Sequence, residues 1–247
     1  MENYKHPPIP TGYTHRSGDW DNGFIIRRDA DGSEFVWIPV GVLAADGKLG
    51  KESGLPFGYR PYGYSGGLPG DVPEELQKQA ESVQKHGGFY LSRYCLSMGE
   101  DGALHSVPNA TPFTGVGRVD AAHMVGKFES ADGVASHLPY AAEQDSAIAW
   151  LITGGKLTEK AVANAAGRRD AKNHKEPVEL TGADESLYGN AIYDLAGTVD
   201  EWTQESMDGA HNWGCCKPCA YPNAYRCYFT PYACYTYTGM RAALYIG

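Results

Sequence analysis

The sequence predicts an α+β fold with two main helices, small antiparallel sheets and extensive loops. Its 247 residues include 31 glycines and 15 prolines, which favours many turns over a helical bundle. The apolar runs 24–26 and 35–40 flank a turn at Asp31–Gly32, a pattern typical of a β-hairpin. Good helix formers over 73–85 predict one main helix, which ends at Gly87–Gly88. Another is predicted over 139–153, where several apolar residues share one face, and it ends at Gly154–Gly155.

The first part of the chain combines an arm, the hairpin and a long loop. Pro7, Pro8 and Pro10 hold the backbone extended, so residues 1–16 are predicted to form an N-terminal arm. We found no internal repeat and no clear linker after it, which makes 17–247 a single domain. Residues 41–72 contain nine glycines and show little periodicity, which predicts an irregular loop.

Shorter elements fill the space around the main helices. The aromatic and apolar segment 89–96 predicts a strand, in which Cys95 is a small buried side chain. Residues 156–187 are polar and mixed, with a short helix expected near 159–166. A further helix is predicted over 120–128, where Ala121, Met124, Val125 and Phe128 form one stripe.

Composition excludes several classes of partner and location. The formal net charge of −9 argues against nucleic acid, because binding to phosphates needs clustered lysines and arginines. No apolar run approaches the roughly 20 residues that span a bilayer, so membrane insertion is not expected. The N-terminus is polar and proline-rich, which predicts synthesis in the cytoplasm without a signal peptide and leaves reduced thiols as the default.

The segment 208–247 differs in chemistry from the rest of the chain. Five of the six cysteines lie between 215 and 234, and six tyrosines lie between 221 and 237. No acidic residue follows Asp208, so residues 1–208 carry about −12 and residues 209–247 carry +3. This separation predicts a scaffold and a distinct functional surface.

One internal block resembles proteins with a C-type lectin fold of the formylglycine-generating-enzyme type. The block is SLYGNAIYDLAGTVDEWTQES at 186–206, with a Gly-Asn turn, a Tyr-Asp-Leu run, a glycine and a Glu-Trp pair in the order found in that family. The segments 35–41, 87–97 and 136–150 are similar to its entry strand, second strand and Leu-Pro-headed helix. The resemblance covers roughly residues 20–246 and implies the C-type-lectin-like form of the α+β fold.

Within that fold, the C-terminus is similar to variable proteins of diversity-generating retroelements. The motifs are PNAYR at 222–226, then Pro231, then GMRAALYI at 239–246. Met240 replaces the usual phenylalanine, and Thr198 and Asp200 replace the common asparagine and tryptophan. The resemblance implies a display protein that binds a protein or glycan ligand, on a phage or prophage particle or a cell surface. Homo-oligomerisation or docking to such an assembly is part of the same expectation.

The resemblance also implies which residues vary and which form the scaffold. Mutated template codons in these systems yield tyrosine, cysteine, histidine, asparagine, phenylalanine and threonine but not tryptophan, lysine or methionine. Trp213, Lys217, Gly239, Met240 and Arg241 are therefore expected to be scaffold, as are Pro222 and Pro231. The predicted variable, ligand-binding residues are His211, Cys215, Cys216, Cys219, Tyr221, Asn223, Tyr225, Cys227, Tyr228, Phe229, Thr230, Tyr232, Cys234, Tyr235, Thr236 and Tyr237.

Three alternatives for this segment stay open. The tyrosines are either a contact surface, as in antibody loops, or part of a packed sheet. A copper- and thiol-dependent oxidase of the same family has paired cysteines where this chain has Lys217 and Pro222, so we expect no enzymatic activity. His211, Cys215, Cys216 and Cys219 have the ligand types of a zinc site, but adjacent cysteines rarely both bind one ion.

A structural calcium ion is the one cofactor that the family resemblance suggests, and none is required. The ligands would be the side chains of Asp194 and Glu201 with the carbonyls of Gly197 and Val199. Such a set of oxygen atoms suits calcium. The alternative is a metal-free turn in which both carboxylates accept hydrogen bonds from backbone amides.

Overall fold

The computed structural model describes residues 6–20, 22–40, 74–154, 158, 178–183, 191–195, 198–206, 214–217, 227–230 and 232–247. Within these ranges the fold is α+β, which confirms the predicted class. The helices are α1 (Glu74–His86), α2 (Arg118–Gly126) and α3 (Ala141–Thr153). The strands are β1 (Tyr13–Ser17), β2 (Ile25–Arg28), β3 (Glu34–Pro39), β4 (Gly88–Ser92), β5 (Ser97–Met98), β6 (Leu104–His105), β7 (Val134–His137), β8 (Asp200–Ser206), β9 (Gly214–Lys217), β10 (Cys227–Phe229), β11 (Thr238–Gly239) and β12 (Ala243–Ile246).

The main sheet has six antiparallel strands in the order β1-β2-β3-β4-β12-β7. Its central strands are buried on both faces, because side chains that alternate along β3 enter two different hydrophobic clusters. Val36 and Ile38 join one cluster, whereas Phe35 and Trp37 join the other. This two-sided burial explains why the strand is a continuous apolar run instead of alternating with polar residues.

Helices cover each face of this sheet. On one face, Val83 of α1 and Leu151 of α3 pack with the first cluster. On the other, Ala121 and Val125 of α2 pack with the second cluster, as their spacing predicts. α3 is buried over nearly its whole length, since even its polar residues Glu143 to Ser146 are hidden from solvent. The helix therefore has more contacts than the single apolar face expected from sequence.

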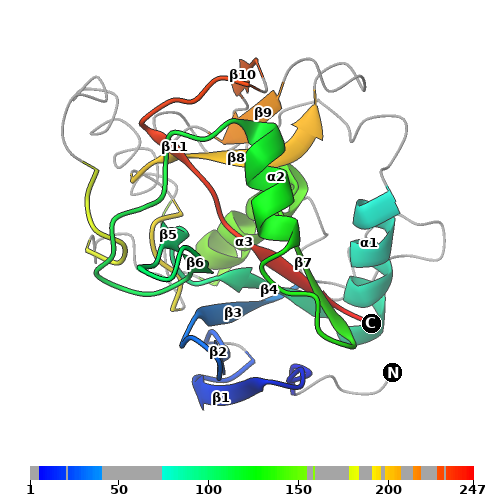
Figure 1. Ribbon diagram of the computed structural model, residues 1–247. Helices are drawn as coiled ribbons and strands as arrows, with labels where there is room; N and C mark the ends of the chain where they lie inside the picture. Colours follow the sequence, from blue (N-terminus) through cyan, green and yellow to red (C-terminus); the bar gives the residue numbers. More distant parts are fainter. Residues whose placement is uncertain are drawn as a thin grey trace.

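A second sheet at the opposite end of the molecule from the β1–β2 hairpin has the order β10-β9-β8-β11 (Figure 1). β10, β9 and β8 are antiparallel, but β11 runs parallel to β8. After β11 the chain crosses back to the main sheet, where β12 lies between β4 and β7. The C-terminal residues thus join the two sheets.

The structure corrects several boundaries. The last residues of the predicted arm, 13–16, belong to β1 (Tyr13–Ser17), because their backbone pairs with β2. Cys95 is buried as expected, but it follows β4 instead of lying within a strand. The main sheet is larger than the small sheets predicted, since distant segments join it. The loop predicted at 41–72 and the helix near 159–166 lie outside the described residues.

None of the helices in the described ranges combines the length and the apolarity needed to cross a membrane.

Candidate functional site

The described part of the predicted binding segment has an alternating surface. The exposed residues are Thr230, Tyr232, Cys234 and Thr236. Positions 233, 235 and 237, which alternate with them, are half-buried. Tyr232 is 77% exposed, the highest value among the large apolar side chains that are described as exposed. A tyrosine so exposed is available for contact, because its ring has little protein packed around it.

Two further tyrosines lie beside it on an anchored backbone. The rings of Tyr235 and Tyr237 stack with centroids 5.1 Å apart and an interplanar angle of 21°. The carbonyl of Tyr235 accepts a hydrogen bond from the N–H of Gly115 at 3.0 Å, and the carbonyl of Tyr237 accepts one from Asp200 at 2.9 Å. The backbone is therefore held by α2's preceding loop and by β8, while the side chains remain partly accessible.

The chain becomes fully buried directly after this segment. A Cβ added to Gly239 would lie 3.1 Å from Val199 Cγ2 and 3.3 Å from the carbonyl oxygen of Phe113, so only glycine fits there without movement. Met240 and Arg241 have no exposed surface. All three residues are therefore part of the protein interior.

Arg241 is the centre of a buried polar network. Its Nε lies 2.8 and 3.1 Å from the two carboxylate oxygens of Glu201. Its other nitrogens donate to the carbonyls of Ser92 at 2.9 Å and Tyr193 at 2.6 Å. Gln144 of α3 also donates to Glu201, at 2.6 Å. The network ties the C-terminal segment to β4, β8 and α3.

The predicted calcium residues fit this network better than an open metal site. Both oxygens of Asp194 accept the N–H of Gly182, at 3.0 and 3.1 Å. Both oxygens of Glu201 already have donors, and Arg241 supplies the compensating positive charge. Burial raises the pKa of each carboxyl, with Arg241 acting in the opposite direction. Val199, which lies between these two residues in the sequence, is buried. Gly197 lies outside the described residues.

The metal-free alternative therefore accounts for Asp194 but not fully for Glu201. Asp194 accepts backbone hydrogen bonds, as that hypothesis expects. Glu201 instead pairs with a buried guanidinium, a partner that lies 40 residues away and that the local motif does not indicate. Among the described residues, the carboxylates of Asp194 and Glu201 both already have protein donors.

The cysteine-rich strands are placed only through their backbones. β9 pairs with β10 so that Cys216 lies opposite Cys227 and Cys215 opposite Tyr228, and Phe229 follows in the same strand. Lys217, at one of the positions where the oxidase family has a cysteine, ends β9. The other predicted site residues His211, Cys219, Tyr221, Asn223 and Tyr225 lie outside the described residues, as does Pro222.

Cys95 has the environment of a structural thiol. Its sulfur is fully buried and donates to Glu201 at 3.0 Å. Burial raises the pKa of this thiol well above its usual value, and the nearby Glu201 carboxylate adds to the effect. Because the thiolate is the nucleophilic form, Cys95 is poorly suited to thiol chemistry.

Sequence reasoning missed the loop that borders the tyrosine segment. Gly115 supports Tyr235, and the carbonyl of Val116 accepts the indole N–H of Trp202 at 2.9 Å. No motif marks these residues, because their role depends on a contact with a strand about 86 positions away.

Comparison with known proteins finds similarity among solved structures alone. No protein-family model matches the chain, and no curated protein matches it. Among solved structures, it is similar to Treponema denticola variable protein 1, with 12% sequence identity over 95% of this chain and 99% of that chain and a TM-score of 0.36. A TM-score of this size does not establish a common fold.

Proposed function

We propose that the chain is a ligand-binding display protein whose variable, ligand-binding region is residues 208–247, while the remaining residues form the frame. The observation that supports this most directly is the exposed run at Thr230, Tyr232, Cys234 and Thr236, which ends at the buried Gly239. Tyrosine suits such a surface, because its ring offers a large contact area with a hydroxyl group at a low cost in conformational entropy.

The finer proposal follows from the motifs. The fold is a C-type-lectin-like domain of the formylglycine-generating-enzyme type, and the surface is diversified by a retroelement. The protein acts on a phage or prophage particle or at a cell surface, where it binds a protein or a glycan without catalysis and without a required cofactor. Buried Gly239, Met240 and Arg241 support a partition between scaffold and exchangeable positions.

Binding measurements with matched variants test the role of the surface. The purified protein is screened against arrays of cell-surface proteins and glycans, and any ligand found is retested with Tyr232→Ala and Thr236→Ala. We expect Tyr232→Ala to weaken binding by about 1 kcal/mol or more, as central aromatic contacts do. Leu180→Ala is the control, because Leu180 is 46% exposed but lies outside the segment. Unchanged binding in both Tyr232→Ala and Thr236→Ala would contradict the proposal.

Stability separates a contact surface from a packed sheet. Substitution of an exposed side chain changes the free energy of unfolding by about 0.5 kcal/mol or less, whereas truncation of a buried aromatic costs about 3–5 kcal/mol. A large fall in the melting temperature of Tyr232→Ala would favour the packed alternative.

The origin of the surface is tested at the level of DNA and chemistry. A retroelement requires a reverse-transcriptase gene and a near-copy of the 3′ end close to this gene. The alternative function, a copper- and thiol-dependent oxidase, requires copper-dependent oxidation of a peptide thiol. If neither DNA feature is found and the protein oxidises a peptide thiol with copper, the oxidase function is supported and our proposal is wrong.

A further inference from the structure

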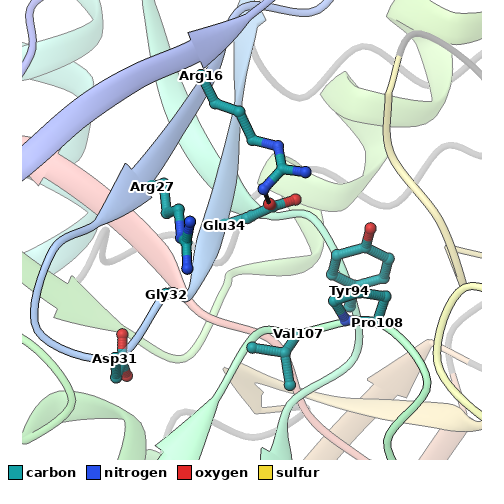
Figure 2. A pocket seen from close by; sticks show the side chains of 8 residues that line it. All are labelled: Arg16, Arg27, Asp31, Gly32, Glu34, Tyr94, Val107 and Pro108. Atoms are coloured by element: carbon teal, nitrogen blue, oxygen red, sulfur yellow. Dashed lines mark ion pairs between the residues drawn. The ribbon is translucent and has the colours of Figure 1, made fainter.

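A small cavity lies beside the β1–β2 hairpin. This hairpin and β10 lie at opposite ends of the molecule (Figure 1). Its volume is about 250 Å³. Figure 2 shows two arginines of the hairpin on one side and a wall from the β4–β5 and β6–α2 connections on the other. The lining residues are Arg16, Arg27, Asp31, Gly32, Glu34, Tyr94, Val107 and Pro108.

The two carboxylates of this lining are already neutralised. Glu34 pairs with Arg16 and Arg93, each at 2.5 Å. Asp31 pairs with Arg28 and accepts the N–H of Ser33 at 2.9 Å. The lining holds two arginines and two acids, but Arg28 and Arg93 pair with these acids from outside it, so the four arginines outnumber the two acids around the cavity.

Arg27 carries that excess charge. Its side chain is exposed and lies over the turn at Gly32, where an added Cβ would come within 2.9 Å of its guanidinium. Gly32 has a φ of +77°, a left-handed backbone conformation that favours glycine. No described residue forms an ion pair with Arg27. A guanidinium in a concave site, without an acidic partner, is suited to a planar oxyanion.

Arg16 is directed at the same cavity by an irregularity in β1. The pairing of β1 with β2 shifts between His15 and Ser17, which leaves Arg16 between the two registers. Such a bulge changes the direction of a side chain relative to a regular strand. Here the result is contact between Arg16 and Glu34, across the strand that lies between them.

Tyr94 adds a hydrogen-bond donor from the opposite wall. Its ring is 4% exposed and stacks on Tyr193 with centroids 5.2 Å apart. No described residue pairs with the hydroxyl group, although the side chain is held almost entirely inside the protein. Burial raises the pKa of Tyr94 to about 12, so the hydroxyl stays protonated and able to donate at neutral pH.

The wall beside Tyr94 is preformed. Thr181 donates to the carbonyl of Val107 at 2.7 Å and accepts the N–H of Ala110 at 3.0 Å. These bonds hold Pro108, which supplies an apolar surface to the cavity. A fixed wall lowers the entropy that binding would otherwise cost.

We propose that this cavity is a second binding site, separate from the tyrosine surface, for a small molecule with a carboxylate or phosphate group. The oxyanion is held by the Arg27 guanidinium with Arg16 beside it, and the Tyr94 hydroxyl donates a further hydrogen bond. Val107 and Pro108 contact the apolar part of the same molecule, and a cavity of 250 Å³ limits it to about the size of a single sugar acid.

Titration of the full chain with three probes tests the site. Glucuronate and inorganic phosphate carry the two oxyanions, and glucose is the neutral match of glucuronate. We expect saturable binding of at least one anion and none of glucose, measured by calorimetry and by shifts of the tyrosine NMR signals. The two anion arms decide whether the ligand chemistry is carboxylate or phosphate.

Variants assign the binding to these side chains. Arg27→Gln should weaken anion binding about tenfold or more, because a hydrogen bond to a charged group is lost. Tyr94→Phe should weaken it about threefold to tenfold while the ring keeps its stack on Tyr193. Lys127→Gln removes one exposed positive charge outside the lining and should change nothing.

Three results would contradict the proposed site. Neither anion would show saturable binding, or glucose would bind as well as glucuronate. In the third, Arg27→Gln and Lys127→Gln would lose the same anion affinity. The last would show attraction by overall charge. Since the probes and variants leave the C-terminal segment unchanged, failure here does not affect the proposed display function.

Discussion

Replacing Arg241 with methionine removes the positive charge at the centre of the buried network. Methionine keeps an unbranched apolar stem of similar reach, so the change acts mainly on charge and hydrogen bonds. Arg241 has no exposed surface, and its side chain contacts both oxygens of Glu201. After the substitution, Glu201 stays buried with only the donors from Gln144 and Cys95.

The expected loss is large for a single substitution. Removing one partner of a buried ion pair costs about 3–5 kcal/mol, because the other charge remains without compensation. For a chain of this size, each kcal/mol lowers the melting temperature by about 2–4 °C. We therefore expect Arg241→Met to melt about 6–20 °C lower than the unmodified protein.

Calorimetry and urea unfolding measure this loss, with Arg16→Met as the matched control. Arg16 also pairs with a glutamate, but its side chain is 49% exposed, so the same substitution should cost about 1 kcal/mol or less. A double variant with Glu201→Gln should lose less than the two single variants combined, by about 1–3 kcal/mol. Simple additivity, or a loss in Arg241→Met no larger than in Arg16→Met, would refute the reasoning.

Three further predictions concern thiols, pH and calcium. With Ellman's reagent, Cys234→Ala should remove one accessible thiol from the native protein, whereas Cys95→Ala should remove none because Cys95 is buried. The pKa of Asp31 is lowered because hydrogen bonds, chiefly from Arg28, outweigh burial, so its stabilisation is present above the usual value of 3.8 and lost as pH falls through the lowered pKa. Asp31→Asn should therefore be less stable at neutral pH and lose less on acidification, and parallel pH profiles in urea unfolding would contradict this. Calcium and EDTA should give the same melting temperature, and a rise with calcium that Asp194→Asn abolishes would instead establish the ion.

Local patterns in the sequence determined much of the fold. The glycine pairs at 87–88 and 154–155 predicted where α1 and α3 end, and the Asp31–Gly32 turn predicted the β2–β3 hairpin. The family resemblance, not a local pattern, suggested Gly239, Met240 and Arg241 as scaffold, and all three are buried. The local predictions succeed because turn geometry and helix propensity act over only a few residues.

Only the tertiary structure decided which distant segments meet. The GMRAALYI run is apolar enough for a strand, but its place between β4 and β7 depends on long-range pairing. Glu201 belongs to a motif that suggested calcium, yet it pairs with Arg241 because the return of the chain brings that guanidinium to it. Arg27 and Tyr94 stand 67 positions apart in sequence and meet at one cavity through the order of the strands. The physical reason is that a buried charge or an open cavity is defined by all of its neighbours, and those neighbours come from several parts of the chain.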